Sequence, residues 1–172
     1  MRLTRLTSLL ALLACLTLLT ACTSARVDES LTATVGGNDD DSQIEFWHSL
    51  TEQRVASHDD AFHALLLFMD GEDPAADYAG RVAELNKRGM LPNGFKGEAD
   101  EAITRGTLAV ALVKLLKIKG GVIMRVIGPA PRYAVRELQY EGVYPPSGEF
   151  QVFTGSQFLA VIGRVEDYQR VK

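Results

Sequence analysis

Two segments of the sequence repeat each other in register. Residues 84–92 and residues 137–145 both read Glu-Leu, then glycine four residues after the leucine, then proline three residues after the glycine. A loop and a helix start capped by threonine follow each segment, with Thr104 in one copy and Thr154 in the other. Ser57 takes this position in a degenerate third copy, so the caps lie 47 and 50 residues apart. Helix-loop-helix units of this size bury their apolar faces only against their neighbours, which predicts a small bundle of packed repeats.

Helix start and stop signals recur along the chain from residue 42 onward. The predicted starts precede apolar residues spaced three or four apart, and they are Ser42 (with Glu45), Ser57, Asp73, Thr104, about Arg132 and Thr154. Glycines near residues 71, 89, 120 and 142 predict the stops. The apolar segment 122–127 fits a short buried helix or a strand equally well. Other strand signals are thin, so the predicted fold class is mainly α, with helix-loop-helix repeats packed as a pseudo-repeat bundle.

The first 21 residues have the pattern of an export signal, with two arginines and then an apolar run from Leu9 to Leu19. The run leads to Leu-Thr-Ala-Cys at Cys22, which resembles the lipobox of bacterial lipoprotein precursors. Cys15 could imitate this box, but it leaves an apolar run of only about seven residues, at the short limit. An uncleaved anchor is disfavoured because a span needs about 20 apolar residues. We therefore predict a signal peptide over residues 1–21 and a lipid on Cys22.

Cleavage before Cys22 would leave 151 residues, which is enough for one domain. This part has 16 basic and 22 acidic residues, a balance that argues against nucleic acid as the main partner but allows a local basic patch. With Cys15 removed and Cys22 lipidated, no thiol remains for a disulfide or for catalysis. Residues 22–41 lack aromatic residues and any apolar period. They are predicted to be a lipidated flexible tether before a domain at residues 42–172.

The central unit, residues 78–115, has a distinctive order of residues. Its loop reads Gly89-Met90-Leu91, then Gly94-Phe95, and its second helix starts with Ile103-Thr104-Arg105. This pattern resembles the S-layer homology repeat, a helix-loop-helix module of cell-surface proteins. The resemblance implies a pseudo-threefold bundle that binds cell-wall polysaccharide, with the Thr-Arg pair among the contacts. The other two units depart from the pattern, and their equivalent pairs are Ser57-His58 and Thr154-Gly155.

Arg105 follows the Thr104 cap, where a cation opposes the helix dipole. An anionic sugar or phosphate bound beside the helix N-terminus would explain this locally unfavourable residue. The alternative is a salt bridge to one of three acids just upstream, Glu98, Asp100 or Glu101. Thr104 and Arg105 are therefore candidate contacts for a cell-wall polymer.

The sequence contains one histidine–carboxylate cluster, His58, Asp59 and His63. Its histidines are five residues apart, whereas the helical zinc motif needs a spacing of four, and its acids are explained by the dipole at a helix start. The acidic runs at residues 39–41 and 70–73 do not have the alternating ligands and sixth-position glycine of a calcium loop. We therefore predict no metal site and no cofactor.

Six basic residues give the middle of the chain a local positive excess: Lys114, Lys117, Lys119, Arg125, Arg132 and Arg136. If the helices near 105–118 and 132–142 adjoin, these side chains can line one surface for an anionic polymer. The alternative is that lysines in a last helical turn only complement its dipole. Five aromatic residues are candidates for stacking on sugars, although such residues at helical spacing are mostly core: Trp47, Phe62, Tyr133, Tyr140 and Tyr144.

No catalytic signature accompanies these features, since the sequence has no Gly-x-Ser-x-Gly, no phosphate-binding glycine loop and no cysteine nucleophile. We therefore expect a noncatalytic cell-envelope lipoprotein, held to a membrane by its lipid, that contacts peptidoglycan, a wall polysaccharide or an envelope protein. The second hypothesis is a protein–protein adaptor in an envelope assembly that binds no polysaccharide. Thr23, rather than an aspartate, follows the anchor, which favours the outer membrane in a cell with two membranes.

Overall fold

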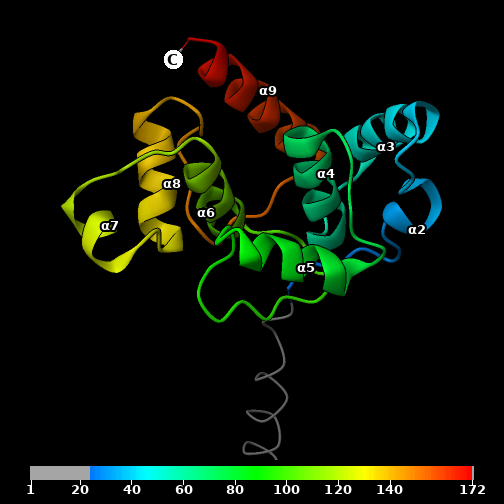
Figure 1. The fold of residues 1–172 in the computed structure, drawn as a ribbon, viewed down its shortest axis with the longest axis horizontal. Helices are drawn as coiled ribbons and strands as arrows, with labels where there is room; N and C mark the ends of the chain where they lie inside the picture. The colour runs from blue at the N-terminus through cyan, green and yellow to red at the C-terminus, as the bar shows by residue number, and fades with distance from the viewer. Residues whose placement is uncertain (1–23, 172) are drawn as a thin grey trace, which may run out of the picture.

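The computed structural model of this chain describes residues 24–171, which form eight helices and no strands (Figure 1). The helices are α2 (Thr32–Val35), α3 (Asp40–Glu52), α4 (His58–Asp70), α5 (Tyr78–Lys87), α6 (Arg105–Leu115), α7 (Val122–Ile127), α8 (Pro131–Tyr140) and α9 (Gly155–Val171). The predicted mainly α fold class is confirmed. The ambiguous segment 122–127 is a helix, α7. The predicted signal peptide and Cys22 lie outside the described residues.

The three predicted cap residues Ser57, Thr104 and Thr154 immediately precede α4, α6 and α9. In each case the cap's hydroxyl oxygen accepts the backbone N–H three residues further on, at 3.0 to 3.2 Å. The residue before each cap and the residue four after it are fully buried, as a hydrophobic staple requires; the pairs are Ala56 with Ala61, Ile103 with Leu108, and Phe153 with Phe158. The sequence signals for these three helix starts are therefore confirmed.

Backbone hydrogen bonds join three cap segments, residues 53–58, 101–106 and 149–155, in a closed ring. The first segment bonds to the second at 2.8 and 2.9 Å and to the third at 2.9 and 3.0 Å. The second bonds to the third at 2.7 and 2.9 Å. Since the first N–H groups of a helix have no partner within that helix, this ring supplies partners for amides that would otherwise be left unsatisfied.

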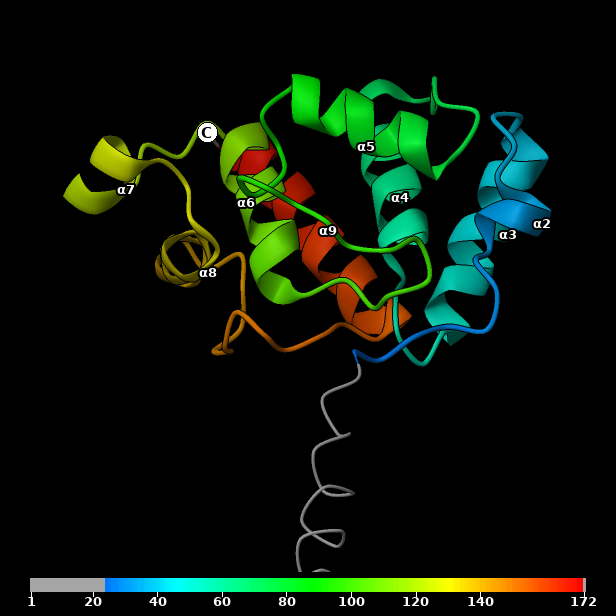
Figure 2. The same ribbon diagram turned by 90° about the horizontal axis from the view of Figure 1, so that it is seen from below.

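The helices pack in the same cyclic order as the cap segments. Each unit has a first helix and a capped second helix, which gives the pairs α3–α4, α5–α6 and α8–α9. α5 packs on α4 and α8 packs on α6, so each of these first helices lies against the second helix of the preceding unit. α3 packs on α9 and joins the first unit to the last (Figure 1 and Figure 2). α7 stands between the second and third units and contacts α8.

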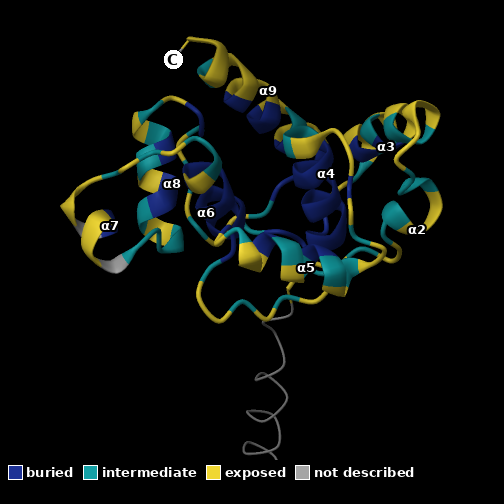
Figure 3. Ribbon diagram, viewed as in Figure 1, coloured by how far each residue is buried: buried dark blue, intermediate teal, exposed yellow. Residues whose placement is uncertain are grey.

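The core is built mainly around α4 and α6, which are buried over most of their length (Figure 3). α6 is buried continuously from Arg105 to Val113. A helix that is apolar on all sides needs neighbours on all sides. The other units supply them, and the outer helices α3, α5, α8 and α9 bury one face each.

Residues 24–41 differ from the flexible tether that their composition predicts. Ala25 O accepts an N–H from the segment before α6 at 2.8 Å. Arg26 forms ion pairs with Asp100 and Glu101 at 2.6 and 3.2 Å. The polar side chains of this segment have partners in the folded body, which composition alone does not reveal. The folded part therefore begins at about Ala25 rather than at residue 42.

Two helix starts also differ from the predicted ones. Asp39 caps α3, because its Oδ1 accepts the N–H of Ser42 at 3.0 Å, so the predicted cap Ser42 already lies in the first turn. Asp77 caps α5 in the same way, and Asp73, the predicted start, lies upstream of the helix. The Asp73 carboxylate is held by buried partners from other helices, which local spacing does not show.

Gly155 lies where the ring closes, and a Cβ there would overlap the carbonyl of Leu50 near the end of α3. Gly155→Ala is expected to lower the free energy of unfolding by about 2 kcal/mol, since backbone cannot move aside as a side chain can. Gly163→Ala, in the same helix with open space around its Cβ, is the matched control and should raise it by up to about 1 kcal/mol. Urea unfolding of the full-length protein in detergent, followed by circular dichroism, measures both. Equal changes in the two variants would contradict the closed ring.

Candidate functional site

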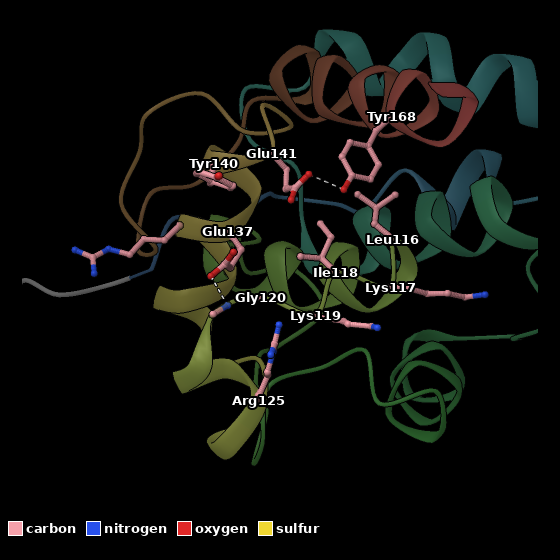
Figure 4. Close-up of a pocket in the computed structure, with 12 residues that line it drawn as sticks. Leu116, Lys117, Ile118, Lys119, Gly120, Arg125, Glu137, Tyr140, Glu141 and Tyr168 are labelled. Carbon is pink, nitrogen blue, oxygen red and sulfur yellow. Dashed lines mark hydrogen bonds between the residues drawn. The ribbon is translucent and has the colours of Figure 1, made fainter. Parts of the chain in front are cut away.

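A groove of about 670 Å³ lies where the C-terminal parts of α6, α8 and α9 meet α7 (Figure 4). Four exposed basic side chains line it: Lys117 and Lys119 from the segment after α6, Arg125 of α7 and Arg136 of α8. In Figure 4, Lys117 and Lys119 extend in one direction, and Arg125 rises from α7 toward the segment that carries them. The packing of α6 on α8, on which the hypothesis of a basic surface depended, is confirmed.

The groove carries a positive excess, because four basic side chains and two carboxylates, Glu137 and Glu141, line it. Glu137 Oε1 accepts the N–H of Gly121 at 2.8 Å, and Glu141 Oε2 accepts the hydroxyl of Tyr168 at 2.7 Å. Among the residues that the structure describes, no carboxylate lies within ion-pair distance of any of the four cations. A concave surface with this balance attracts anions.

A cation complements a helix dipole when it lies in the last turn of that helix, so the alternative explanation can be checked for each basic residue. α6 ends at Leu115 and has one basic residue, Lys114, in its last turn. Lys117 and Lys119 lie beyond that turn, and Arg125 and Arg136 belong to other helices. Arg125 lies in the last turn of α7, so the dipole explanation accounts for Lys114 and Arg125 and leaves Lys117, Lys119 and Arg136 to be explained.

Lys117 has a φ of 54°, and no other non-glycine residue of segment 24–171 has a positive φ. The turn is held by Ile118 N–H, which donates to Val113 O at 3.0 Å. Glycine takes this backbone region without a steric penalty, whereas a lysine there is uncommon. A charged side chain kept at a position that favours glycine is an observation from which a functional role can be inferred.

Tyr140 is the aromatic residue best placed to stack on a sugar. It lines the groove and is 87 % exposed. Of the other four predicted stacking residues, Phe62 and Tyr144 are buried, and Trp47 and Tyr133 pack against the core. The groove therefore combines cations with one accessible ring.

Arg105 lies at the opposite end of α6 and is only 8 % exposed. Its guanidinium lies 4.9 Å from the centre of the Phe153 ring, and Nη2 donates to Gln157 Oε1 at 3.2 Å. In the described part of the chain, no ion pair joins Arg105 to the upstream acids Glu98, Asp100 or Glu101, so the alternative salt bridge is not formed; Arg26 pairs with the last two. Nε is buried and has no hydrogen-bond partner among the described residues. The hydroxyl of Thr104, the residue before it, caps α6.

The residues equivalent to Arg105 in the other two units have different surroundings. His58 is buried, and its Nδ1 lies 3.0 Å from Glu98 O. Gly155 has no space for a side chain, because its Cβ position is filled by the end of α3. The departures of these units from the Thr-Arg pattern therefore have a packing explanation, and Arg105 is the one cation among the three positions.

Arg81 of α5 is the centre of a buried ionic cluster that sequence reasoning missed. Its Nη1 lies 2.6 Å from Asp59 Oδ1, and its Nε lies 2.5 Å from Asp73 Oδ2. His63 Nδ1 lies 2.6 Å from the same Asp73 oxygen. The hydroxyl of Ser30 donates to Asp59 at 3.1 Å, so the cluster also holds the N-terminal segment. The signal available in the sequence was the pair Asp59 and His63, four residues apart on one helix face.

This buried cluster has a structural role, because it joins α4, α5 and the N-terminal segment. The His63–Asp73 contact is like the one that orients a catalytic imidazole, but the His63 ring is fully buried and Phe46 packs on it at 4.6 Å. A substrate cannot reach that ring. Within residues 24–171, no group of three or more His, Cys, Asp or Glu side chains could hold a metal ion.

Comparison of the chain with known protein families, with curated proteins and with solved structures finds no match. Among the described helices, none is both long enough and apolar enough to cross a membrane. The resemblance to the S-layer homology repeat and the lipid on Cys22 therefore stay predictions.

Burial lowers the pKa of His58 below its usual value of 6.5, although its hydrogen bond to Glu98 O and the charge of Glu101 act against this. The unfolded chain then binds a proton at a higher pH than the folded chain does. The stability that neutral His58 contributes is therefore complete above pH 6.5 and is lost as the pH falls through the folded pKa.

His58→Gln is expected to reduce the fall in the free energy of unfolding between pH 7 and pH 5, by at most about 1.4 kcal/mol per pH unit. Urea unfolding at several pH values measures this slope. His48→Gln is the control, because His48 is exposed, and it should keep the slope of the unchanged protein. A His58→Gln slope equal to that of the control would show that burial of His58 does not cause it.

Proposed function

We propose that this chain is a noncatalytic cell-envelope lipoprotein whose helical domain binds an anionic cell-wall polymer. The observation that carries the proposal is the groove, in which four cations without carboxylate partners among the described residues lie beside the exposed ring of Tyr140. Cations pair with the carboxylates or phosphates of such a polymer, and an aromatic ring stacks on its sugars. Thr104 and Arg105 are proposed as a second contact, which is weaker because Arg105 is largely buried.

The repeat arrangement supports this assignment. The resemblance to the S-layer homology repeat implies a pseudo-threefold bundle, and the three pairs of helices pack in cyclic order with their cap segments joined in a closed ring. We propose that the bundle is of this kind, with its main polymer contact moved to the groove at the other end of α6. The packing of His58 and Gly155 leaves two of the three family-type contact positions without an accessible cation.

The proposed anchor places the domain close to a membrane. With a lipid on Cys22, three residue-to-residue steps lead from the anchor to the first contact of the body at Ala25. An extended chain of that length reaches about 10 Å. The start of α6 would therefore lie close to the membrane surface, on the outer membrane in a cell with two membranes.

Cys22→Ser is expected to abolish incorporation of a clickable fatty acid into the protein in growing cells, because the thioether needs the Cys22 sulfur. Cys15→Ser is the matched control and should keep full incorporation, since Cys15 lies in the predicted leader. In-gel fluorescence of the full-length protein measures both. Label at the unchanged level in Cys22→Ser would remove the anchor from the proposal.

Binding to purified cell-wall sacculi tests the polymer contact. Lys119→Ala/Arg125→Ala is expected to weaken co-sedimentation of the full-length protein in detergent by about tenfold, since two exposed charge contacts contribute about 1.4 kcal/mol together. Arg54→Ala/Lys96→Ala removes the same charge elsewhere on the surface and should bind as the unchanged protein does. Equal losses in both double variants would mean that net charge, and not the groove, governs binding.

Lys117→Gly separates binding from folding in the same assay. Glycine suits the positive φ at this position, so the variant should lose affinity for sacculi while its free energy of unfolding stays equal or rises by up to about 1 kcal/mol.

A complete absence of binding in the unchanged protein would favour the protein–protein adaptor. The valines of α7 would then be its contact surface, since Val122 and Val126 are 76 % and 77 % exposed.

A further inference from the structure

The groove adjoins two further pockets along the C-terminal half of α6. A middle pocket of about 400 Å³ shares Lys117, Ile118 and Lys119 with the groove and adds Lys114 and Pro129. A loop pocket of about 640 Å³ shares Lys114 and Pro129 with the middle pocket. The shared residues place the three depressions next to one another along the C-terminal half of α6, and we call the three together the track.

The polar groups change in kind along this track. The groove holds most of the cations, and the middle pocket holds three lysines, two of them shared with the groove. The loop pocket has the amides of Asn86 and Asn93 and a single cation, Lys114. Over the described residues, no protein group forms a hydrogen bond with the side chains of Asn86, Asn93 or Lys114, so all three can bind a ligand.

The walls of the loop pocket are suited to a flat, polar ligand. Prolines at 92, 129 and 131 give it rigid apolar surface. Gly89 lies against the Lys114 stem, because a Cβ at Gly89 would lie 3.3 Å from Lys114 Cε. Glycine at this position therefore leaves room for the lysine that links the loop pocket to the middle pocket.

We infer that the ligand is an extended linear glycan bearing carboxylates, which occupies all three pockets with its acid groups toward the groove. This inference rests on the proposed function and names the class of polymer. Each pocket has the volume of a typical small-molecule site, enough for about one or two sugar rings. The cations are spread along the track rather than converging on one point, which fits a chain and not a compact anion. Tyr140 and the prolines offer flat surfaces on which sugar rings can stack. A polyol phosphate chain has no such rings, so these surfaces favour a glycan.

The test uses glycan strands released from sacculi by an amidase, which frees one carboxylate on each lactyl sugar, and separated by length. Calorimetry with the full-length protein in detergent is expected to show affinity that rises at least about tenfold from two sugars to six, as successive pockets fill. Asn86→Ala/Asn93→Ala should weaken binding of the six-sugar strand about fivefold and leave the two-sugar strand unchanged. Lys96→Ala is the control and should alter neither value.

Two results would overturn the inference. Affinity that is the same for all lengths, or no affinity for any strand, would exclude the extended glycan while binding to sacculi still supported the proposed function. Absence of binding to both sacculi and strands would exclude the proposed function as well. Retained binding of the two-sugar strand by the asparagine double variant shows that this variant is folded.

Discussion

The ring of backbone hydrogen bonds among the three cap segments is the constraint on which the rest of the fold depends. Each helix start leaves amides that have no partner within their own helix and need one elsewhere. Here each cap segment satisfies its neighbour, and the staple residues Ala56, Ile103 and Phe153 bury the apolar side of the same segments. A unit removed from the ring would expose both polar and apolar groups at once, so the three units stabilise one another.

The ring joins the N-terminal ends of α4, α6 and α9, and it does not constrain the structure at their C-terminal ends. At the C-terminal end of α6, segments 116–121 and 128–130 and the loop at 88–94 form the walls of the track. Segment 116–121 carries the positive φ of Lys117, and α7 with its exposed valines lies between this segment and segment 128–130; packing in the core requires neither feature. The end that holds the fold together and the end that we propose as the main polymer contact are therefore separate, and substitutions in one should leave the other intact.

The sequence predicted what depends on neighbours in the chain. The caps Ser57, Thr104 and Thr154, their staples and the helical class are local patterns, and they are confirmed. The ordered structure of residues 24–41 depends on partners far along the chain, such as Asp100 for Arg26. The start of α5 was misplaced because Asp73 is held by His63 and Arg81, which spacing within one helix does not indicate. The basic residues of the groove were identified, but only the packing of α6 on α8 brings them together. The burial of Arg105 depends on Phe153, 48 residues away, which spacing within one helix cannot indicate.

The position of the N-terminal segment places the proposed anchor and the proposed binding track at opposite ends of α6. Ala25 bonds to Ala102, three residues before α6 begins, whereas the groove lies beyond the last turn of α6. A helix of 11 residues is about 16 Å long. With a lipid on Cys22, the membrane would lie at the start of α6 and the track at its end. A rigid helix in the core would then separate the two sites, so a polymer held in the track would lie away from the lipid surface that anchors the chain.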